Sequence, residues 1–250
     1  MRLDRRHVRL IARDACETAA FLHSRDARVA ARAELTTCRT SEDFYRFTQR
    51  HFVRGAAQNM SEITAFVDYA RRIEPRVVCE IGVQDGGTNF ILSRALGTVT
   101  TIVGIDLYVS LKSQLRFYRR GDVALHIIEG SSQAADTHRK LQRVLGSRPI
   151  DVLFIDGDHT YEGALRDFSM YSPLVRAGGL IAFHDIVEDS YTRFAIKTES
   201  YVGDVPTLWR RVREHYHYEE FIDAPDQDGR GIGVIEQDPA VAVLALNFQR

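Results

Sequence analysis

Short apolar segments alternate with helical segments from residue 76 onward, repeating at intervals of roughly 25 residues. Each apolar segment is too continuous for a sheet with one face in water, and the stretches between them carry the three-to-four-residue spacing of helices. Alternating strands and helices are typical of a parallel, doubly wound α/β sheet. The five expected strands cover residues 76–82, 100–107, 123–130, 150–157 and 178–186.

The order of elements changes after residue 186. A helix is expected over 206–216, followed by two short strands at 218–222 and 231–237 with a polar loop between them. Such a pair favours an antiparallel hairpin. The sequence therefore predicts a seven-stranded, mostly parallel, Rossmann-like sheet that ends in a C-terminal antiparallel hairpin.

The first part of the chain, residues 1–75, has a helical pattern throughout. Its clearest helix is expected to begin at Ser61 as N-cap and to end before Pro75. We therefore divide the chain into an N-terminal helical extension, 1–75, and a cofactor-binding domain, 76–250. The extension is rich in arginine, which indicates a solvated helical face or, alternatively, contact with an anionic substrate or a second subunit of a homo-oligomer.

Composition excludes several classes of protein. The formal net charge is −1 and the isoelectric point about 6.8, so no basic field indicates a nucleic-acid partner. No apolar run is long enough to span a membrane, and the start of the chain lacks the apolar segment of a signal peptide. Three scattered cysteines fit a reducing compartment. We expect a cytoplasmic protein without a membrane or nucleic-acid partner.

Ligands of open α/β sheets bind at the carboxyl ends of the strands, and the first strand ends in a glycine-rich loop. In "CEIGVQDGGTNF" (79–90), Gly82, Gly86 and Gly87 permit a sharp turn that brings a ligand close to backbone amides. The dinucleotide fingerprint G-x-G-x-x-G is absent, because Gln84 stands where the second glycine would be. This difference disfavours an NAD-dependent enzyme.

The next two strands end in polar residues suited to a nucleoside. Asp106 closes the second strand, where a carboxylate can bind both hydroxyls of a ribose. Ser131 and Ser132 follow the third strand. They could contact an adenine edge, or they could cap the helix that follows.

These motifs, together with "IDGDHTYEG" and "GGLIAFHD", resemble those of class I S-adenosylmethionine-dependent methyltransferases over about residues 76–236. More narrowly, they resemble the metal-dependent sugar O-methyltransferases of antibiotic tailoring, of the macrocin and mycinose type. The resemblance implies that S-adenosylmethionine is the cofactor. The residues we expect to bind it are Glu80, Gly82, Gly86, Thr88, Asp106, Ser131, Ser132 and Asp156.

The resemblance also implies a divalent cation, usually Mg²⁺, held after the fourth and fifth strands. The corresponding positions are Asp156 and the pair His184 and Asp185. The family usually has two acids at this pair, and a histidine is a softer ligand than Mg²⁺ prefers. Asp185 is therefore the firmer ligand, while His184 binds the ion, orients Asp185 or contacts the substrate.

A sugar hydroxyl needs a base to accept its proton, and the candidates are Asp158 and His159. His159 has the more suitable ordinary pKa, although it could also be a helix-start residue bonded to backbone. Catechol-type relatives use a lysine, and none of the three lysines lies in a motif loop. Gln58 and Glu62 could border the cofactor as a lid, but solvent exposure is the simpler interpretation.

The predicted function is S-adenosylmethionine- and metal-dependent O-methylation of a sugar hydroxyl on a small glycosylated natural product, as in antibiotic tailoring. One alternative is a metal-independent methyltransferase of another nucleophile on the same fold. The others are an NAD-dependent oxidoreductase and a catalytically silent scaffold.

Overall fold

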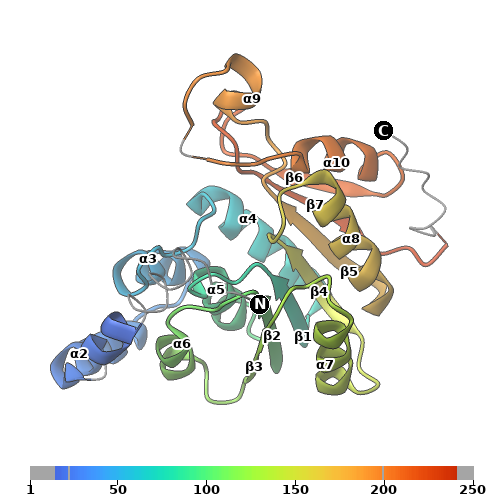
Figure 1. Cartoon of the computed structure of the whole chain (residues 1–250). Coiled ribbons are helices and arrows are strands. Elements are labelled where there is room, and N and C mark those ends of the chain that lie inside the picture. The colour runs from blue at the N-terminus through green and yellow to red at the C-terminus, as the bar shows by residue number, and fades with distance from the viewer. Residues whose placement is uncertain (1–14, 22, 199, 241–250) are drawn as a thin grey trace.

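The structure, a computed structural model, describes residues 15–21, 23–198 and 200–240. These residues build one mixed sheet in the order β3-β2-β1-β4-β5-β7-β6, in which β1 to β5 run parallel and β7 is antiparallel to both neighbours (Figure 1). The predicted fold class is confirmed, including the C-terminal hairpin. The strands are β1 (Val77–Ile81), β2 (Thr101–Asp106), β3 (Ala124–Glu129), β4 (Ile150–Ile155), β5 (Val175–His184), β6 (Tyr218–Phe221) and β7 (Ile232–Glu236).

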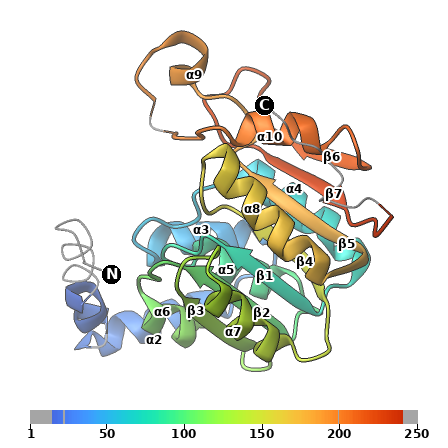
Figure 2. The ribbon, with the colours of Figure 1, turned by 45° about the vertical axis from the view of Figure 1, so that its right-hand side comes forward.

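One face of the sheet is covered by helices that come before and after residue 75, the predicted domain boundary. Its core joins Val78, Phe154 and Leu180 of the strands to Phe66 and Phe90 of the helices. The N-terminal helices lie along this face of the sheet (Figure 2), and their buried residues belong to the same hydrophobic core. The elements on this side are α2 (Arg25–Leu35), α3 (Ser41–His51), α4 (Met60–Ala70), η1 (Arg71–Ile73), α5 (Gly87–Ala95) and α6 (Lys112–Tyr118).

The opposite face carries a second core. Alternate strand residues such as Cys79, Leu153 and Phe183 point to this side, as the period of two in a strand requires. Trp209 packs into it with 1% of its surface exposed. The elements on this side are α7 (Ala135–Leu145), α8 (Tyr161–Tyr171), η2 (Ser172–Leu174) and α10 (Val205–Val212). The short α9 (Ser190–Phe194) projects from the body in both views (Figures 1 and 2).

The start of α4 differs from the prediction. The helix begins at Met60 with Asn59 as N-cap, where Asn59 and Glu62 form a capping box. Ser61, the expected cap, lies inside the helix, and its hydroxyl donates to Asp223 at 2.6 Å. The pattern of apolar residues predicted the helix correctly. Its first residue was misplaced because two possible N-caps, Asn59 and Ser61, lie two residues apart.

Strand pairing brings the ends of β1, β4 and β5 together. Ile81 pairs with Ile155, and Ile155 pairs with Phe183. The residues that follow these strands therefore meet at one edge of the sheet. Among the described residues, no helix is long and apolar enough to cross a membrane.

Candidate functional site

A cavity of about 730 Å³ lies at this carboxyl edge. Loops after β1, β2, β3, β4 and β5 line it, and residues 53–58 close it from the N-terminal side. Six of the eight predicted cofactor-binding residues line the cavity: Gly82, Thr88, Asp106, Ser131, Ser132 and Asp156. Glu80 and Gly86 are buried behind its wall.

Gly82 is the point at which the glycine loop touches the end of β4. Its φ is +90°, and a Cβ added there would lie 1.8 Å from the carbonyl oxygen of Asp156. The Asp156 N–H in turn donates to the Ile81 carbonyl at 2.8 Å. No other residue type fits this position, because both the backbone conformation and the space require glycine.

The glycine loop is bonded to the end of β2. The N–H groups of Gln84 and Tyr108 donate to the two carboxylate oxygens of Asp106, at 2.8 and 3.0 Å. Burial raises the pKa of Asp106, and these backbone hydrogen bonds oppose the rise. Asp106 therefore lines the cavity as predicted and also fixes the loop that would face the cofactor.

Glu80 is a buried acid under the same loop. It is 1% exposed, and burial raises its pKa to about 8. Its Oε2 has no hydrogen-bond partner within the part of the chain that the structure describes. An acceptor left in this condition is costly, so it fits a position that a bound polar group would complete.

The two serines after β3 line the cavity and do not cap the following helix. The N-cap of α7 is Ala134, which makes no side-chain capping bond. The carbonyl of Ser132 instead accepts a hydrogen bond from the Tyr171 hydroxyl at 2.7 Å. The capping interpretation is therefore wrong, and the nucleoside contact of these serines remains a prediction.

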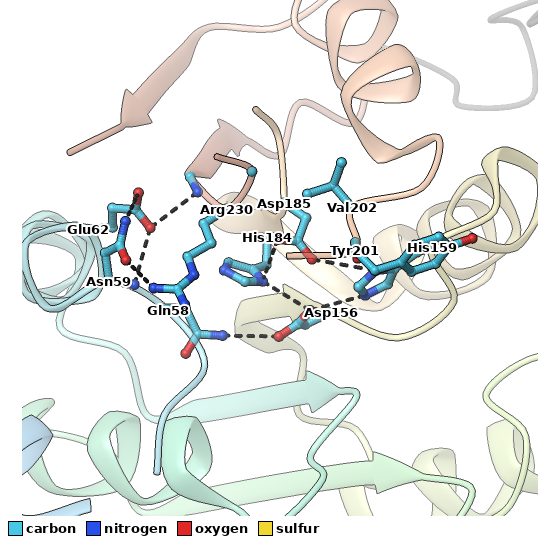
Figure 3. A network of polar contacts seen from close by, with 12 residues as sticks. Gln58, Asn59, Glu62, Asp156, His159, His184, Asp185, Tyr201, Val202 and Arg230 are labelled. Carbon is cyan, nitrogen blue, oxygen red and sulfur yellow. Dashed lines mark hydrogen bonds and ion pairs between the residues drawn. The ribbon is translucent and has the colours of Figure 1, made fainter. Parts of the chain in front are cut away.

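Asp156, His184 and Asp185 form a compact cluster after β4 and β5, which we call the acidic triad (Figure 3). The Nδ1 of His184 lies 3.1 Å from Oδ1 of Asp156 and 3.4 Å from Oδ1 of Asp185. One donor atom from each residue lies within 4.8 Å of the others. Asp185 has φ of +64°, an uncommon conformation for a residue with a side chain, which marks a special position.

The charges of the triad are strongly coupled. Burial alone would raise the pKa of Asp156, but the adjoining imidazoles of His184 and His159 outweigh it and hold this pKa at about 2. Burial would lower the pKa of His184, and the two carboxylates instead raise it well above its ordinary value. The triad is thus a largely buried cluster in which two carboxylates stabilise a positive charge between them.

Donor distances test whether one ion fits the triad. Donors that bind one ion at about 2.1 Å lie about 3.0 Å apart in an octahedral site and about 3.4 Å apart in a tetrahedral one. The separations of 3.1 and 3.4 Å from His184 fall in this range. The residues present therefore fit a divalent cation.

His159 lies beside the triad, whereas Asp158 points away from it. The Nδ1 of His159 is 2.6 Å from the Tyr201 carbonyl, and since a carbonyl only accepts, Nδ1 carries the proton. The Nε2 is 3.6 Å from Asp156. Burial lowers the pKa of His159, but Asp156, Asp185 and the bond to Tyr201 raise it to about 9.

Asp158 serves the start of α8. Its Oδ1 accepts hydrogen bonds from the Thr160 N–H at 2.9 Å and the Thr160 hydroxyl at 2.8 Å. Its Oδ2 accepts from Gln133 at 3.3 Å. His159 does make a hydrogen bond to backbone, at the Tyr201 carbonyl. The side chain that is hydrogen-bonded to the start of the helix, however, belongs to Asp158.

Gln58 is a site residue whose weight the sequence did not reveal. It is 1% exposed, so the expected solvent exposure is wrong. Its Nε2 donates to Asp156 at 3.0 Å, and its Oε1 accepts from the Thr88 hydroxyl at 2.6 Å. Gln58 therefore links the acidic triad to the start of α5. Gln58 and Asp156 are 98 residues apart in the sequence, so no local sequence pattern predicts their hydrogen bond.

Glu62 is buried as well, at 1% exposure, and it anchors the loop between β6 and β7. It accepts hydrogen bonds from the Gln227 side chain at 2.6 Å and the Gly231 N–H at 3.2 Å. The same loop brings Arg230 to the cavity, where its guanidinium donates to Asn59 (Figure 3). The spacing Asn59-x-x-Glu62 is the sequence signal that predicts this buried cap.

Comparison with known proteins identifies the central part of the chain. A family model described as "Methyltransferase domain" matches residues 79–186, which span the glycine loop and the acidic triad. Residues 79–186 are thus similar to methyltransferase domains. An uncharacterized protein of Acanthamoeba polyphaga mimivirus is 32% identical over 115 residues, which cover 42% of this chain and 49% of the viral protein.

Solved structures with the same fold are O-methyltransferases. The enzyme of Bacillus cereus in complex with S-adenosylhomocysteine is 15% identical, covers 78% of this chain and 90% of its own, and gives a TM-score of 0.55. TomG of Streptomyces achromogenes, involved in tomaymycin synthesis and solved with S-adenosylmethionine, is 18% identical (82% and 90% covered, TM-score 0.54).

MycE of the mycinamycin biosynthetic pathway, solved with Mg and S-adenosylhomocysteine, is 19% identical with a TM-score of 0.53. The two structures align over 80% of this chain, and the aligned part covers only 55% of MycE. The family model and these structures agree with the resemblance to methyltransferases that the sequence predicts. The solved structures are less than 20% identical to this chain, and what they share with it is the fold.

Proposed function

We propose that this chain transfers a methyl group from S-adenosylmethionine to a sugar hydroxyl of a small glycosylated natural product, with a divalent cation bound by the acidic triad. The observation that carries the proposal is the position of His159 beside that triad, in the cavity that the glycine loop and Asp106 also line. Each part of the reaction then has a group to serve it.

The cofactor half would be held by the loop after β1 and the ends of β2 and β3. Asp106 would accept hydrogen bonds from the ribose hydroxyls, while Ser131 and Ser132 would face the adenine. Thr88 and Gly82 would border the methionine portion near Asp156. In this arrangement the donor methyl would face the triad, where an acceptor must approach within roughly 3–3.5 Å.

The acceptor half would be built from Asp156, Asp185, His184 and His159. When bound, a divalent cation would stabilise negative charge developing on the acceptor hydroxyl and offset the carboxylates that raise the pKa of His159. With Nδ1 protonated toward Tyr201, Nε2 of His159 is the atom that can accept the hydroxyl proton. Asp158 is the weaker candidate because Thr160 and Gln133 occupy its oxygens.

Several alternatives lose support. An NAD-dependent oxidoreductase is disfavoured by the methyltransferase domain and by Gln84 in the loop. A metal-independent methyltransferase leaves the buried cluster of Asp156, His184 and Asp185 without a purpose. The cytoplasmic location, the division at residue 75 and self-association through the N-terminal helices remain predictions.

A substrate panel tests the proposal. The purified chain is incubated with S-adenosylmethionine and a divalent ion, and with glycosylated macrolides, the free sugars, catechols and carboxylic acids in parallel. Mass spectrometry and NMR then locate the added methyl. The expected product is a methyl ether on a sugar; methylation confined to catechols or to nitrogen or carboxylate acceptors would contradict the sugar assignment.

A further inference from the structure

We infer that the acidic triad selects a first-row transition ion, of the class of Mn²⁺, Fe²⁺, Co²⁺ or Zn²⁺, over Mg²⁺. The inference rests on the proposed function, since it concerns the cation that the reaction would use. It revises the Mg²⁺ expected from the sequence. The residue responsible is His184, whose Nδ1 stands among the carboxylate oxygens.

The first argument is the type of donor. The Nδ1 of His184 is 3.1 Å from Asp156 and 3.4 Å from Asp185, so any ion that contacts both carboxylates meets an imidazole nitrogen. Mg²⁺ is a hard cation that prefers oxygen ligands and keeps much of its water, whereas imidazole suits the later divalent ions. A nitrogen in this place therefore adds more affinity for a transition ion than for Mg²⁺.

The second argument is the charge of the site. Once an incoming ion has displaced the proton that the carboxylates hold on His184, two carboxylates and a neutral imidazole balance one divalent ion. A third carboxylate at position 184 would leave an excess negative charge. The triad thus has less electrostatic attraction for a hard cation than three acids would have. It must take more of its affinity from the metal–nitrogen bond, which strengthens from Mn²⁺ onward in the first row.

The third argument is that His184 has no room to leave. It is 4% exposed and its ring stacks against Phe154 with an interplanar angle of 26°. Its Nε2 has no hydrogen-bond partner among the described residues, so the ring is oriented by this packing and by the carboxylates. The ring therefore cannot rotate out into solvent, and any ion bound by the two carboxylates lies next to the His184 nitrogen.

Direct metal binding tests the inference without any methyl acceptor. The whole chain is stripped with chelator and titrated with Mn²⁺ while electron paramagnetic resonance follows the free ion; Mg²⁺ is then added as competitor. We expect Mn²⁺ to bind at least about 100-fold more tightly than Mg²⁺, with nitrogen-14 coupling to the bound ion. Equal affinity for Mg²⁺ would overturn the inference.

Variants of His184 assign the preference to this residue. His184→Glu should reduce the Mn²⁺ to Mg²⁺ ratio by about tenfold or more and remove the nitrogen coupling. His184→Asn, which offers a neutral oxygen in a smaller side chain, should do the same if the glutamate variant fails to fold. His215→Glu, an exposed control outside the cavity, should keep the wild-type ratio. An unchanged ratio in both position-184 variants would contradict the inference.

Asp156→Ala separates this inference from the proposed function. The variant should lose the tight Mn²⁺ site. If wild-type protein shows no site that depends on Asp156, the metal-dependent function fails together with the inference. If it shows such a site with Mg²⁺ bound equally well, only the selection of the ion fails.

Discussion

The two halves of the cavity are built in different ways. On the cofactor side, the loop after β1 is fixed by backbone: Gly82 packs against the Asp156 carbonyl, and Asp106 accepts from two N–H groups. On the acceptor side, Asp156, His184, Asp185 and His159 are held together by charged side chains. The cofactor side thus depends on backbone conformation, and the acceptor side depends on interactions between charged side chains.

This difference teaches where each half is vulnerable. A backbone site is sensitive to changes of conformation, because its donors are amides in a fixed turn, and among side chains it depends on those that hold the turn, such as Asp106. A charged site depends on which side chains are present and on their partners, because removing one leaves the others uncompensated. Gln58 joins the halves through its bonds to Thr88 and Asp156.

The largest effect should come from Gly82→Ala, which strikes both halves at once. The new Cβ would lie 1.8 Å from the Asp156 carbonyl at a φ of +90°, so the end of β1 or β4 must shift. We expect a loss of more than about 3 kcal/mol in the free energy of unfolding, and no cofactor binding. Urea titration measures this; Gly97→Ala, which has open space, should change stability by less than about 1 kcal/mol.

The next effect concerns the choice of base and breaks only the acceptor half. His159→Asn should lower the rate of methyl transfer by roughly 10²- to 10⁴-fold, because it removes the proton acceptor beside the triad. Asp158→Asn should lower it far less, since Asp158 supports the start of α8. Single-turnover rates at saturating S-adenosylmethionine decide the matter. A reversed order would assign the base to Asp158.

Asp106→Asn should break only the cofactor half. The variant loses a carboxylate that accepts from the Gln84 N–H and that we propose to bind the ribose, so S-adenosylmethionine binding should weaken by roughly 10- to 100-fold. Calorimetric titrations of cofactor and of Mn²⁺ on the same samples compare the halves. Metal affinity should stay within about threefold of wild type; a parallel loss of metal binding would show that the halves are not separate.

The smallest effect is a dependence of stability on pH at Glu80. Its folded pKa of about 8 lies above its ordinary value of 4.5, so the folded state holds an extra proton between these pH values. The stability of the free protein should therefore fall as pH rises through this window, by at most about 1.4 kcal/mol per pH unit. Glu80→Gln should remove that slope; thermal unfolding from pH 5 to 8 would contradict the account if both proteins lose stability alike.

The sequence predicted what local patterns determine. The alternation of apolar segments led to the sheet and its hairpin, and the glycines of the loop after β1 led to the cofactor cavity. Asp156, His184 and Asp185 were expected together from the family resemblance, and the structure brings them together because the parallel strands β4 and β5 end at one edge.

Contacts between residues far apart in the chain could not be predicted from the sequence. The bond from Gln58 to Asp156 and the contact of His159 with Tyr201 depend on how loops pack across the cavity. The start of α4 was misplaced because Ser61 and Asn59 are both good caps, and only the packing of Glu62 against residues 227–231 selects Asn59. Chain direction and packing, not composition, settled these points.

The central claim is that cofactor binding and metal-assisted transfer reside in two separable halves of one cavity. A single-turnover experiment tests it most directly: chelator-stripped protein, loaded with S-adenosylmethionine and a glycosylated acceptor, is followed by mass spectrometry before and after Mn²⁺ is added, with Asp156→Asn alongside. We predict that S-adenosylmethionine binds in every sample and that the methyl ether forms only in metal-loaded wild type. Methyl transfer at the same rate in stripped protein would contradict the account.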